Sequence, residues 1–263
     1  GPARNLLEVV AVAGVPIAQD LAAQAAAIDL THFDSQVALL RTARLLRTTG
    51  PRHSDTIEPY HDRVRESVLA RLSDKAQRSW HGRLALALES ADGADPETLL
   101  IHWHGAGFPE RASGYAVQAA EQAAKALAFE RASRLYKQAL VLSQATGKKR
   151  RQLLSRLSDA LVNQGRNQDA AGLLLQAAEG ALPEQASTLR RLAADQLLRS
   201  GRFDEGLEFI KKALHDLGLA YPNSLPFTMG SLALHQMWLG VRGLSFRERS
   251  EAEVPAEELV RID

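Results

Sequence analysis

Histidine side chains are the groups in this sequence best suited to metal or proton chemistry, and they occur beside other polar residues at two places. His102 and His104 could offer imidazole nitrogens to a transition metal. Residues two apart on a helix point to different sides, so we do not expect this pair to chelate one ion. The second place is His61-Asp62-Arg63. Its simplest interpretation is the start of a helix, where the charge of Asp62 favours the positive helix end.

The sequence signatures of common enzyme classes are missing. No GxxxxGK[ST] loop is present, so the chain carries no Walker-type nucleotide site, and Gly147-Lys148-Lys149 fits a turn between helices instead. No protein-kinase signature and no nucleophile elbow occur either. There is no cysteine, which excludes disulfides and thiolate metal ligands. We therefore expect no catalytic residue, no metal site and no cofactor in this part of the chain, and no enzyme activity from it alone.

Charge and composition further limit the classes of protein to which this chain could belong. The 32 Lys and Arg residues nearly balance the 31 Asp and Glu residues, which leaves a net charge of +1. This balance removes the broad attraction on which nucleic-acid binders rely, so nucleic acid is not the expected partner. The apolar run at residues 6–17 is too short and too interrupted for a membrane span, so we expect a cytoplasmic protein with no membrane partner. Abundant alanine and leucine predict a mainly α fold.

Residues 3–72 are predicted to form a compact first domain. The apolar spacing predicts helices over residues 5–13 and 17–27. Asp34 or Ser35 is expected to cap a third helix. The first part of the chain therefore starts with three helices.

Two short strands are predicted to follow the third helix. Residues 45–49 and 56–60 contain strand-favouring Thr and Ile, and Gly50-Pro51 lies between them as a turn. Three helices followed by a small β-hairpin form the pattern of a winged-helix domain.

Arginines at the end of the third helix raise a DNA-binding hypothesis. Arg41, Arg44 and Arg47 follow one another closely and could contact phosphates from that helix. The competing interpretation is that they form a solvated face or pair with a partner domain. We favour the second interpretation because the charge of the whole chain is balanced.

Residues 73–110 are predicted to form connecting helices. Ser73-Asp74 can cap a helix that runs over residues 75–89. Pro96 fits the first turn of the next helix, and Pro109 fits the start of the helix that leads into the following region.

Residues 111–218 contain three related segments, offset by 38 and then by 36 positions. In each, a small residue is followed by a large apolar one four positions later and by alanine seven positions later. These packing positions are Ala132, Tyr136 and Ala139 in the first copy, Ala170, Leu174 and Ala177 in the second, and Gly206, Ile210 and Ala213 in the third. Offsets of four and seven lie on one helix face, which predicts stacked helical hairpins. Gly165 and Gly201 are expected in the left-handed turns within the hairpins.

This spacing of small, bulky and alanine positions resembles the tetratricopeptide repeat (TPR). The periods exceed the usual length of about 34 residues, and the tryptophan near the start of the motif is missing. The sequence therefore predicts a degenerate, TPR-like α-solenoid. A plain array of α-hairpins is the alternative.

Residues 219–263 are predicted to hold a capping helix and a charged linker. Pro222 and Pro226 are expected to break the chain before a helix over residues 231–242. Trp238 could form an exposed docking patch, but we expect it to be buried against the last repeat. Residues 246–255 are highly charged and fit a surface linker.

Residues 58–68 are similar to a segment of the STAND class of bacterial signal-transduction ATPases, some of which are fused to a serine/threonine protein kinase. The shared pattern is an aromatic residue, Tyr60, followed by His61-Asp62-Arg63 and an apolar residue, and Ser67 stands where the family usually has alanine. Residues 114–132 are similar to the start of that family's helical repeat region, and residues 246–249, 254–255 and 257–259 resemble its linker. Together they cover most of the chain in the family's order.

The resemblance implies the roles of the parts. In that family a P-loop ATPase module precedes the winged helix, which packs on the ATPase rather than on DNA, and a helical sensor array follows. ATP or ADP with Mg would then be bound by the parent protein. A winged-helix histidine touches the nucleotide phosphate in some relatives, and His61 is the position to which that role carries over. Gly1-Pro2 fits a scar of tag cleavage, and we expect the chain to be an excised fragment.

These observations lead to one expected function and one alternative. We expect a non-catalytic sensor module that binds a protein or peptide ligand through its helical repeats and relays that event to its own ATPase or kinase domain. The alternative is a winged-helix transcriptional regulator that binds DNA and carries a helical effector arm. An enzyme with a dispersed site is a third class, which no motif supports.

Overall fold

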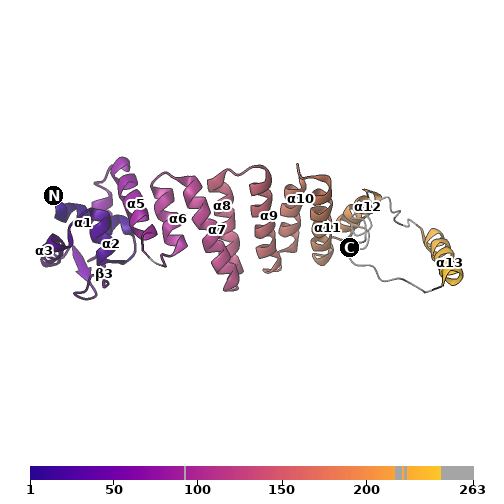
Figure 1. Cartoon of the computed structure of the whole chain (residues 1–263), viewed down its shortest axis with the longest axis horizontal. Helices are drawn as coiled ribbons and strands as arrows, with labels where there is room; N and C mark the ends of the chain where they lie inside the picture. The colour runs from indigo at the N-terminus through magenta and orange to yellow at the C-terminus, as the bar shows by residue number, and fades with distance from the viewer. Residues whose placement is uncertain (92, 217–220, 222–223, 244–263) are drawn as a thin grey trace. The chain divides into compact units, whose positions relative to one another are not determined.

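The computed structural model describes residues 1–91, 93–216, 221 and 224–243. For residues 213, 215 and 216 it describes the backbone but not the side chain. Over these residues the chain is mainly helical, with thirteen helices and one small sheet (Figure 1). No described helix has the length and apolarity needed to cross a membrane. The chain divides into two compact units, residues 1–165 and residues 166–263.

The first unit begins with a small mixed domain. Its elements are α1 (Pro2–Ala13), β1 (Ile17–Ala18), α2 (Gln19–Ala26), α3 (Leu30–Thr42), β2 (Leu46–Thr48), β3 (Thr56–Pro59) and α4 (Asp62–Leu69). The strands pair antiparallel in the order β1-β3-β2, with Ile17 opposite Ile57 and Arg47 opposite Glu58. Leu6, Phe33 and Ile57 are fully buried between the helices and the sheet. Burial of these large apolar side chains holds the domain together.

Two details of this domain differ from the sequence prediction. The helix expected over residues 17–27 starts only at Gln19, because Ile17 and Ala18 pair with β3 as a third strand. The expected cap of the third helix was also wrong. Asp29, rather than Asp34 or Ser35, begins that helix, since its carboxylate accepts a hydrogen bond of 3.0 Å from the Thr31 amide. The strand partner of Ile17 lies forty residues away, which local helix propensity does not register.

Helix α5 (Asp74–Glu89) belongs to this domain's core and also begins the row of helices that follows. One of its faces places Trp80, Leu84 and Ala87 in the cluster that contains the buried residues of α1, α2 and α3. The Trp80 indole donates a hydrogen bond of 2.9 Å to Glu8 on α1. Ser73 caps α5, as the sequence predicts, by accepting a hydrogen bond from the Ala76 amide.

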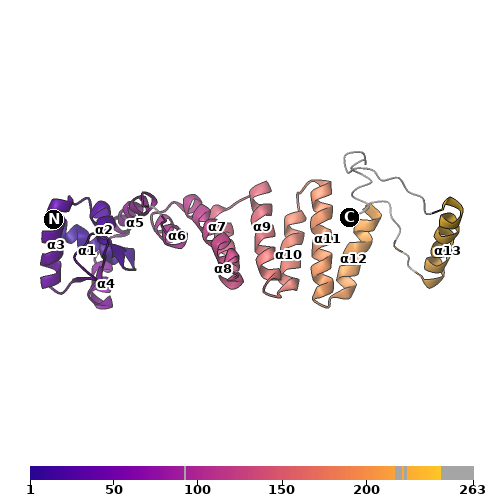
Figure 2. The same ribbon diagram turned by 60° about the horizontal axis from the view of Figure 1, so that its bottom comes forward.

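The remaining helices of the first unit pack each on the next, in chain order (Figure 2). They are α6 (Pro96–Gly105), α7 (Pro109–Lys125), α8 (Phe129–Ser143) and α9 (Gly147–Val162). Pro96 and Pro109 lie in the first turns of α6 and α7, as the sequence predicts. These positions cost no hydrogen bond because the first amides of a helix have no partner within it.

Several turns between neighbouring helices have the same backbone conformation. After α6, α7 and α11, a residue in the left-handed conformation lets the next amide bond back to the last helical turn. The three bonds are Phe108 N to Trp103 O at 3.0 Å, Ala128 N to Ala123 O at 2.9 Å and Arg202 N to Leu197 O at 3.0 Å. Glycine takes the left-handed position at Gly107 and Gly201, whereas Leu127 takes it at φ +59°. The left-handed turns predicted at Gly165 and Gly201 are confirmed.

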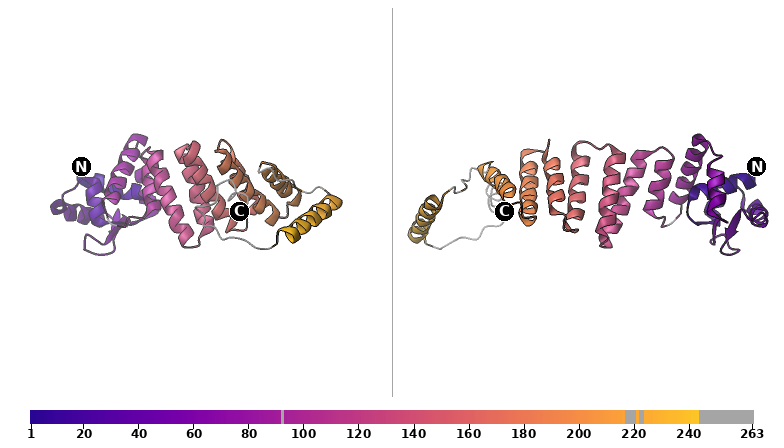
Figure 3. Two further views of the ribbon diagram at one scale, coloured as in Figure 1. Left: turned by 45° about the vertical axis from the view of Figure 1, so that its right-hand side comes forward. Right: turned by 180° about the vertical axis from the view of Figure 1, so that it is seen from behind.

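The second unit contains α10 (Asn167–Ala178), α11 (Pro183–Arg199), α12 (Phe203–Asp216) and α13 (Leu225–Arg242). Helix α11 packs on both α10 and α12, and the three lie next to one another (Figure 3). Their shared cluster includes Ala171, Leu174, Ala193 and Leu197.

Helix α13 corrects two expectations about the end of the chain. Pro226 does not break the chain before a helix but lies in the first turn of α13, where proline is tolerated. Trp238 was expected to be buried, yet it is 54% exposed. The Cζ atom of the Arg242 guanidinium lies 4.8 Å from the centre of its ring. No described α13 residue is buried. The charged linker expected at residues 246–255 and Pro222 lie outside the described residues.

Glycine at position 206 permits the close approach of α11 and α12, and this gives a test of the packing. A Cβ added there would come within 2.9 Å of the Leu198 side chain and 3.2 Å of the Ala194 carbonyl oxygen. We expect Gly206→Val to lower the free energy of unfolding of the second unit by about 1–3 kcal/mol. Chemical denaturation followed by circular dichroism measures this change.

Gly172 on α10 provides the matched control, because a Cβ added there meets no atom within 4 Å. Gly172→Ala should stabilise the unit by up to about 1 kcal/mol through helix propensity. Equal destabilisation by both substitutions would contradict a close helix approach at Gly206.

Candidate functional site

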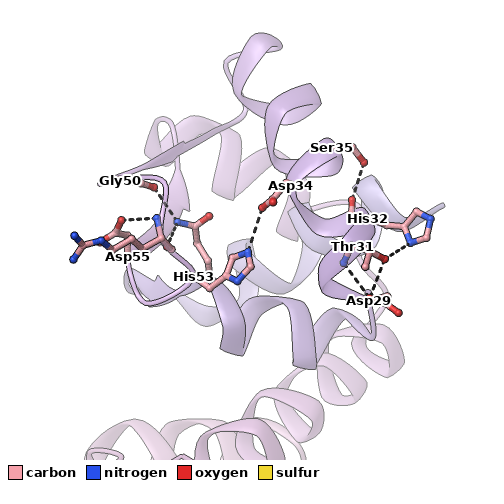
Figure 4. Close-up of polar contacts among 10 residues, drawn as sticks. Asp29, Thr31, His32, Asp34, Ser35, Gly50, His53 and Asp55 are labelled. Atoms are coloured by element: carbon pink, nitrogen blue, oxygen red, sulfur yellow. Dashed lines mark hydrogen bonds and ion pairs between the residues drawn. The ribbon is translucent and has the colours of Figure 1, made fainter.

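The β2–β3 hairpin is fastened to the start of α2 by backbone and amide hydrogen bonds. The Gln19 side-chain amide donates to the carbonyl oxygens of Gly50 at 3.1 Å and Arg52 at 2.9 Å. Gln19 is buried, so both donor positions of its amide are satisfied inside the structure. Asp55 closes the loop by accepting a 2.8 Å hydrogen bond from the Arg52 amide (Figure 4). The hairpin is therefore a fixed element.

The exposed side of α3 carries a mixed set of polar groups. The pKa of the Asp29 carboxyl is lowered, first by the hydrogen bond from the Thr31 amide and then by the Thr31 hydroxyl. Asp34, one turn further on, lies 3.3 Å from the Nε2 atom of His53 on the hairpin (Figure 4). This surface therefore presents carboxylates, which repel the phosphates of a nucleic acid.

The three arginines of the DNA-binding hypothesis do not act as one group. Arg47 forms an ion pair of 2.9 Å with Glu58 across the β2–β3 pair. Arg41 is exposed in the last turn of α3, and Arg44 lies in the following turn at φ +54°. Only Arg41 and Arg44 thus present charges without an ion pair among the described residues.

His61 is the exposed residue that directly precedes α4. Its ring meets the Tyr60 ring edge-on, with centroids 4.7 Å apart and planes at 88°. It accepts no hydrogen bond as a side-chain cap, whereas Asp62 places its carboxylate in the first turn, as the sequence predicts. The position of α4 is held by Arg65, which donates a hydrogen bond of 3.1 Å to the Ala11 carbonyl oxygen. His61 is therefore an exposed imidazole at a helix N-terminus.

His102 pairs with a histidine that the sequence analysis did not single out. His102 is fully buried and His104 exposed, so the two lie on different sides of α6. The Nδ1 atom of His102 lies 2.9 Å from the Nδ1 atom of His81 on α5. The ring centroids are 5.1 Å apart, so the two nitrogens point at each other almost head-on. This geometry fits a shared proton, because two nitrogens that bind one metal ion would converge on a third point.

Burial lowers the pKa values of both histidines of this pair. Desolvation, and then the neighbouring His81, lowers the pKa of His102 to about 4. Desolvation, and then His104, lowers the pKa of His81 as well. The Nε2 atom of His102 has no hydrogen-bond partner. The pair is therefore uncharged at neutral pH, and α5 and α6 are joined by a neutral hydrogen bond.

Glu89, in the last turn of α5, is the second polar junction of this region. Its carboxylate accepts hydrogen bonds from the Trp103 indole at 2.9 Å and from the Tyr115 hydroxyl at 2.6 Å. The Arg111 guanidinium contacts both of its oxygens, at 3.1 and 3.0 Å, and lies 3.7 Å from the centre of the Trp103 ring. One carboxylate thus joins α5 to both α6 and α7.

The hydroxyl of Tyr115, which donates to Glu89, has a raised pKa. Burial raises the pKa of its hydroxyl to about 12, and the hydrogen bond to Glu89 adds to that effect. The partners of Glu89 lie 14, 22 and 26 residues away in the sequence, so no local motif could identify the junction.

The predicted repeat positions lie mostly inside the units. Ala132, Tyr136 and Ala139 on α8 are buried, as are Ala170, Leu174 and Ala177 on α10. Gly206 is buried on α12 and Ile210 is partly buried, whereas the side chain of Ala213 lies outside what the structure describes. The Ser113 hydroxyl on α7 donates a hydrogen bond of 3.0 Å to the Ala139 carbonyl oxygen, which ties α7 to α8 at one of these positions.

Ion pairs also link helices that are two apart in the first unit. Glu97 on α6 pairs with Arg131 on α8, and Glu110 on α7 pairs with Lys149 on α9 at 3.2 Å. Glu121 and Arg156 form a second pair between α7 and α9. In every case the acid is on the earlier helix and the base on the later one. Such exposed pairs add little stability, but they favour one register of the helices.

Compared with known proteins, the chain matches no protein-family description, and no curated protein matches it in sequence. Among the described residues no group of three or more His, Cys, Asp or Glu side chains is arranged to hold a metal ion.

The buried histidine predicts an acid-sensitive structure. Folded His102 has a pKa of about 4, below the value of 6.5 of a free histidine, so the unfolded state binds more protons between these values. Its contribution to stability is complete above about pH 6.5 and is lost as the pH falls towards 4, by about 2–3 kcal/mol. Urea denaturation at pH 7.5 and at pH 4.5 measures this loss.

His102→Phe is the matched variant, since it keeps a buried ring without a titrating group. We expect its stability to fall less between these pH values, by about 2 kcal/mol, than that of the unchanged protein. An identical pH dependence in both proteins would mean that His102 is not buried in its neutral form.

The Glu89 junction predicts a large cost for losing one carboxylate. Glu89→Ala should lower the free energy of unfolding of the first unit by about 3 kcal/mol, because it leaves Arg111, Trp103 and Tyr115 without their acceptor. Glu110→Ala, which removes only the exposed pair with Lys149, should cost less than about 1 kcal/mol. Comparable losses from both substitutions, measured by urea denaturation at pH 7.5, would contradict the junction.

Proposed function

We propose that this chain is a non-catalytic regulatory module of a STAND-class signalling ATPase. In this proposal its helical pairs bind a protein or peptide ligand, and its first domain relays that event to an ATPase or kinase module of the parent protein. ATP or ADP with Mg would be bound by that module, with no catalytic residue supplied from this chain.

The order of elements in the first domain supports this proposal most. A helix, a strand, two helices and two strands follow one another, and β3 lies between β1 and β2. This is the order of a winged-helix domain, and a row of helices follows it directly, as the resemblance implies for the class. The junctions at Glu8–Trp80, His81–His102 and Glu89 support a relay, since they join that domain through α5 to α6 and α7.

The setting of His61 agrees with the role that the resemblance implies. An exposed imidazole at the N-terminus of α4, beside the backbone amides of the first turn, is suited to a phosphate group. The Tyr60 ring limits the orientations that the His61 ring can take. In this proposal the histidine contacts the nucleotide of the parent protein in its closed, ADP-bound state.

Binding of DNA by α3 has less support. Arg47 is engaged by Glu58, and the exposed side of α3 carries Asp34. A recognition surface would need its bases free to pair with phosphates.

The test uses the intact parent protein. His61→Ala should raise basal ATP hydrolysis several-fold, because the closed state loses a contact to the phosphate, and deletion of residues 109–216 should change the output as well. Steady-state phosphate release measures both changes. Ser67→Ala, an exposed change on α4 to the residue usual in the class, should leave the rate unaltered. The proposal fails if neither His61→Ala nor the deletion alters hydrolysis or kinase activity.

A further inference from the structure

The charge of this chain is balanced as a whole but not along its length. Residues 109–165, which form α7, α8 and α9 with their turns, contain ten Lys and Arg residues and four Asp and Glu residues. Their net charge is therefore +6, and the rest of the chain carries −5. The bases are Arg111, Lys125, Arg131, Arg134, Lys137, Lys148, Lys149, Arg150, Arg151 and Arg156. A local excess of this size attracts acidic partners.

Part of this positive charge is used within the structure. Arg111 and Arg131 pair with Glu89 and Glu97 on earlier helices, and Lys149 and Arg156 pair with acids on α7. Arg134 and Lys137 on α8 are exposed and form no ion pair among the described residues. These two bases are therefore available to a partner.

The two bases lie on one exposed strip of α8. Arg134, Lys137 and Val141 are spaced by three and four residues, so they share one side of the helix, opposite the buried Ala132 and Ala139. Leu127 lies in the turn before α8, seven residues before Arg134 along the chain. We call Leu127, Arg134, Lys137 and Val141 the α8 strip.

The apolar members of the α8 strip indicate what kind of partner fits. Leu127 and Val141 are 74% and 75% exposed, and they lie on either side of the two bases along the chain. Nucleic-acid phosphates would neutralise the bases but leave these side chains in water. A polypeptide that carries both carboxylates and apolar side chains covers both kinds of group.

An ion pair also links α8 to α6, which lies two helices earlier in the chain. Glu97 on α6 reaches Arg131 on α8, and Ile101, one turn beyond Glu97, is 55% exposed.

We propose that the α8 strip is a docking surface for an acidic polypeptide segment that also carries apolar side chains. The proposal rests on the proposed function, since it names the chemistry of the protein ligand that the helical pairs would bind. The carboxylates pair with Arg134 and Lys137, and the apolar side chains cover Leu127 and Val141.

The test measures binding to the whole chain by fluorescence anisotropy. The probe is a labelled helical peptide of about twelve residues, the length that matches the strip, with glutamates in its middle and leucines near its two ends, all on one side of the helix. The control peptide has glutamine in place of each glutamate. We expect saturable binding of the acidic peptide, weakened at least tenfold, or about 1.4 kcal/mol, by R134E/K137E. The control peptide should bind at least about tenfold more weakly than the acidic one.

A matched variant separates the strip from the general positive field. K148E/R150E makes the same change in charge at two exposed bases on α9, and we expect it to weaken binding by less than about threefold. V141S should weaken binding without changing its salt dependence, since it removes apolar area alone.

Four results would overturn the proposal: no binding of the acidic peptide, equal binding of the glutamine peptide, equal losses from the two charge reversals, or tighter binding of a duplex DNA of equal charge. Each is distinguishable from failure of the proposed function. If deletion of residues 109–216 still alters the output of the parent protein, the sensor role stands and only the acidic chemistry of the ligand is wrong.

Discussion

Everything in the first unit depends on the packing of α5 on two partners at once. One of its faces completes the core of the small mixed domain with Trp80, Leu84 and Ala87. The adjacent face, one position further along the helix, turns His81 towards α6, and Leu88 on that face is buried as well. A helix that packs on two partners through two of its faces joins those partners. Helix α5 therefore joins the small domain to the row of helices that follows it.

Buried polar groups at α5 make this arrangement specific as well as stable. Apolar packing alone tolerates helices that slide or rotate by a residue, because the contacts are not directional. Glu89 accepts from three side chains on two helices, and each of those bonds breaks if α6 or α7 shifts. The neutral His81–His102 pair adds a second such constraint. The cost is sensitivity to acid, since a buried imidazole that gains a proton there forms no ion pair with a carboxylate of the described residues.

The sequence was sufficient for features set by local chemistry and insufficient for those set by distant partners. Ser73, Pro96, Gly165 and Gly201 act through their own backbone positions, so their roles could be predicted directly. The strand at Ile17 depends on Ile57, and the Glu89 junction depends on residues up to 26 positions away. Trp238 shows a related failure, because an aromatic residue was assumed to find a pocket that the described residues do not form. Whether the elements make a winged helix with tetratricopeptide-like pairs stays a prediction.

Net charge is informative only at the scale of the surface on which it acts. A charge of +1 over 263 residues argues against a nucleic-acid binder, yet α7, α8 and α9 together carry +6. The Debye length at physiological salt is about 8 Å, so a partner at α8 responds to the nearest bases and hardly to acids elsewhere on the chain. Four of those bases are committed to pairs that fix the order of the helices. The same charges therefore serve two purposes, and only the bases left over after helix packing, above all Arg134 and Lys137, can select what the helices bind.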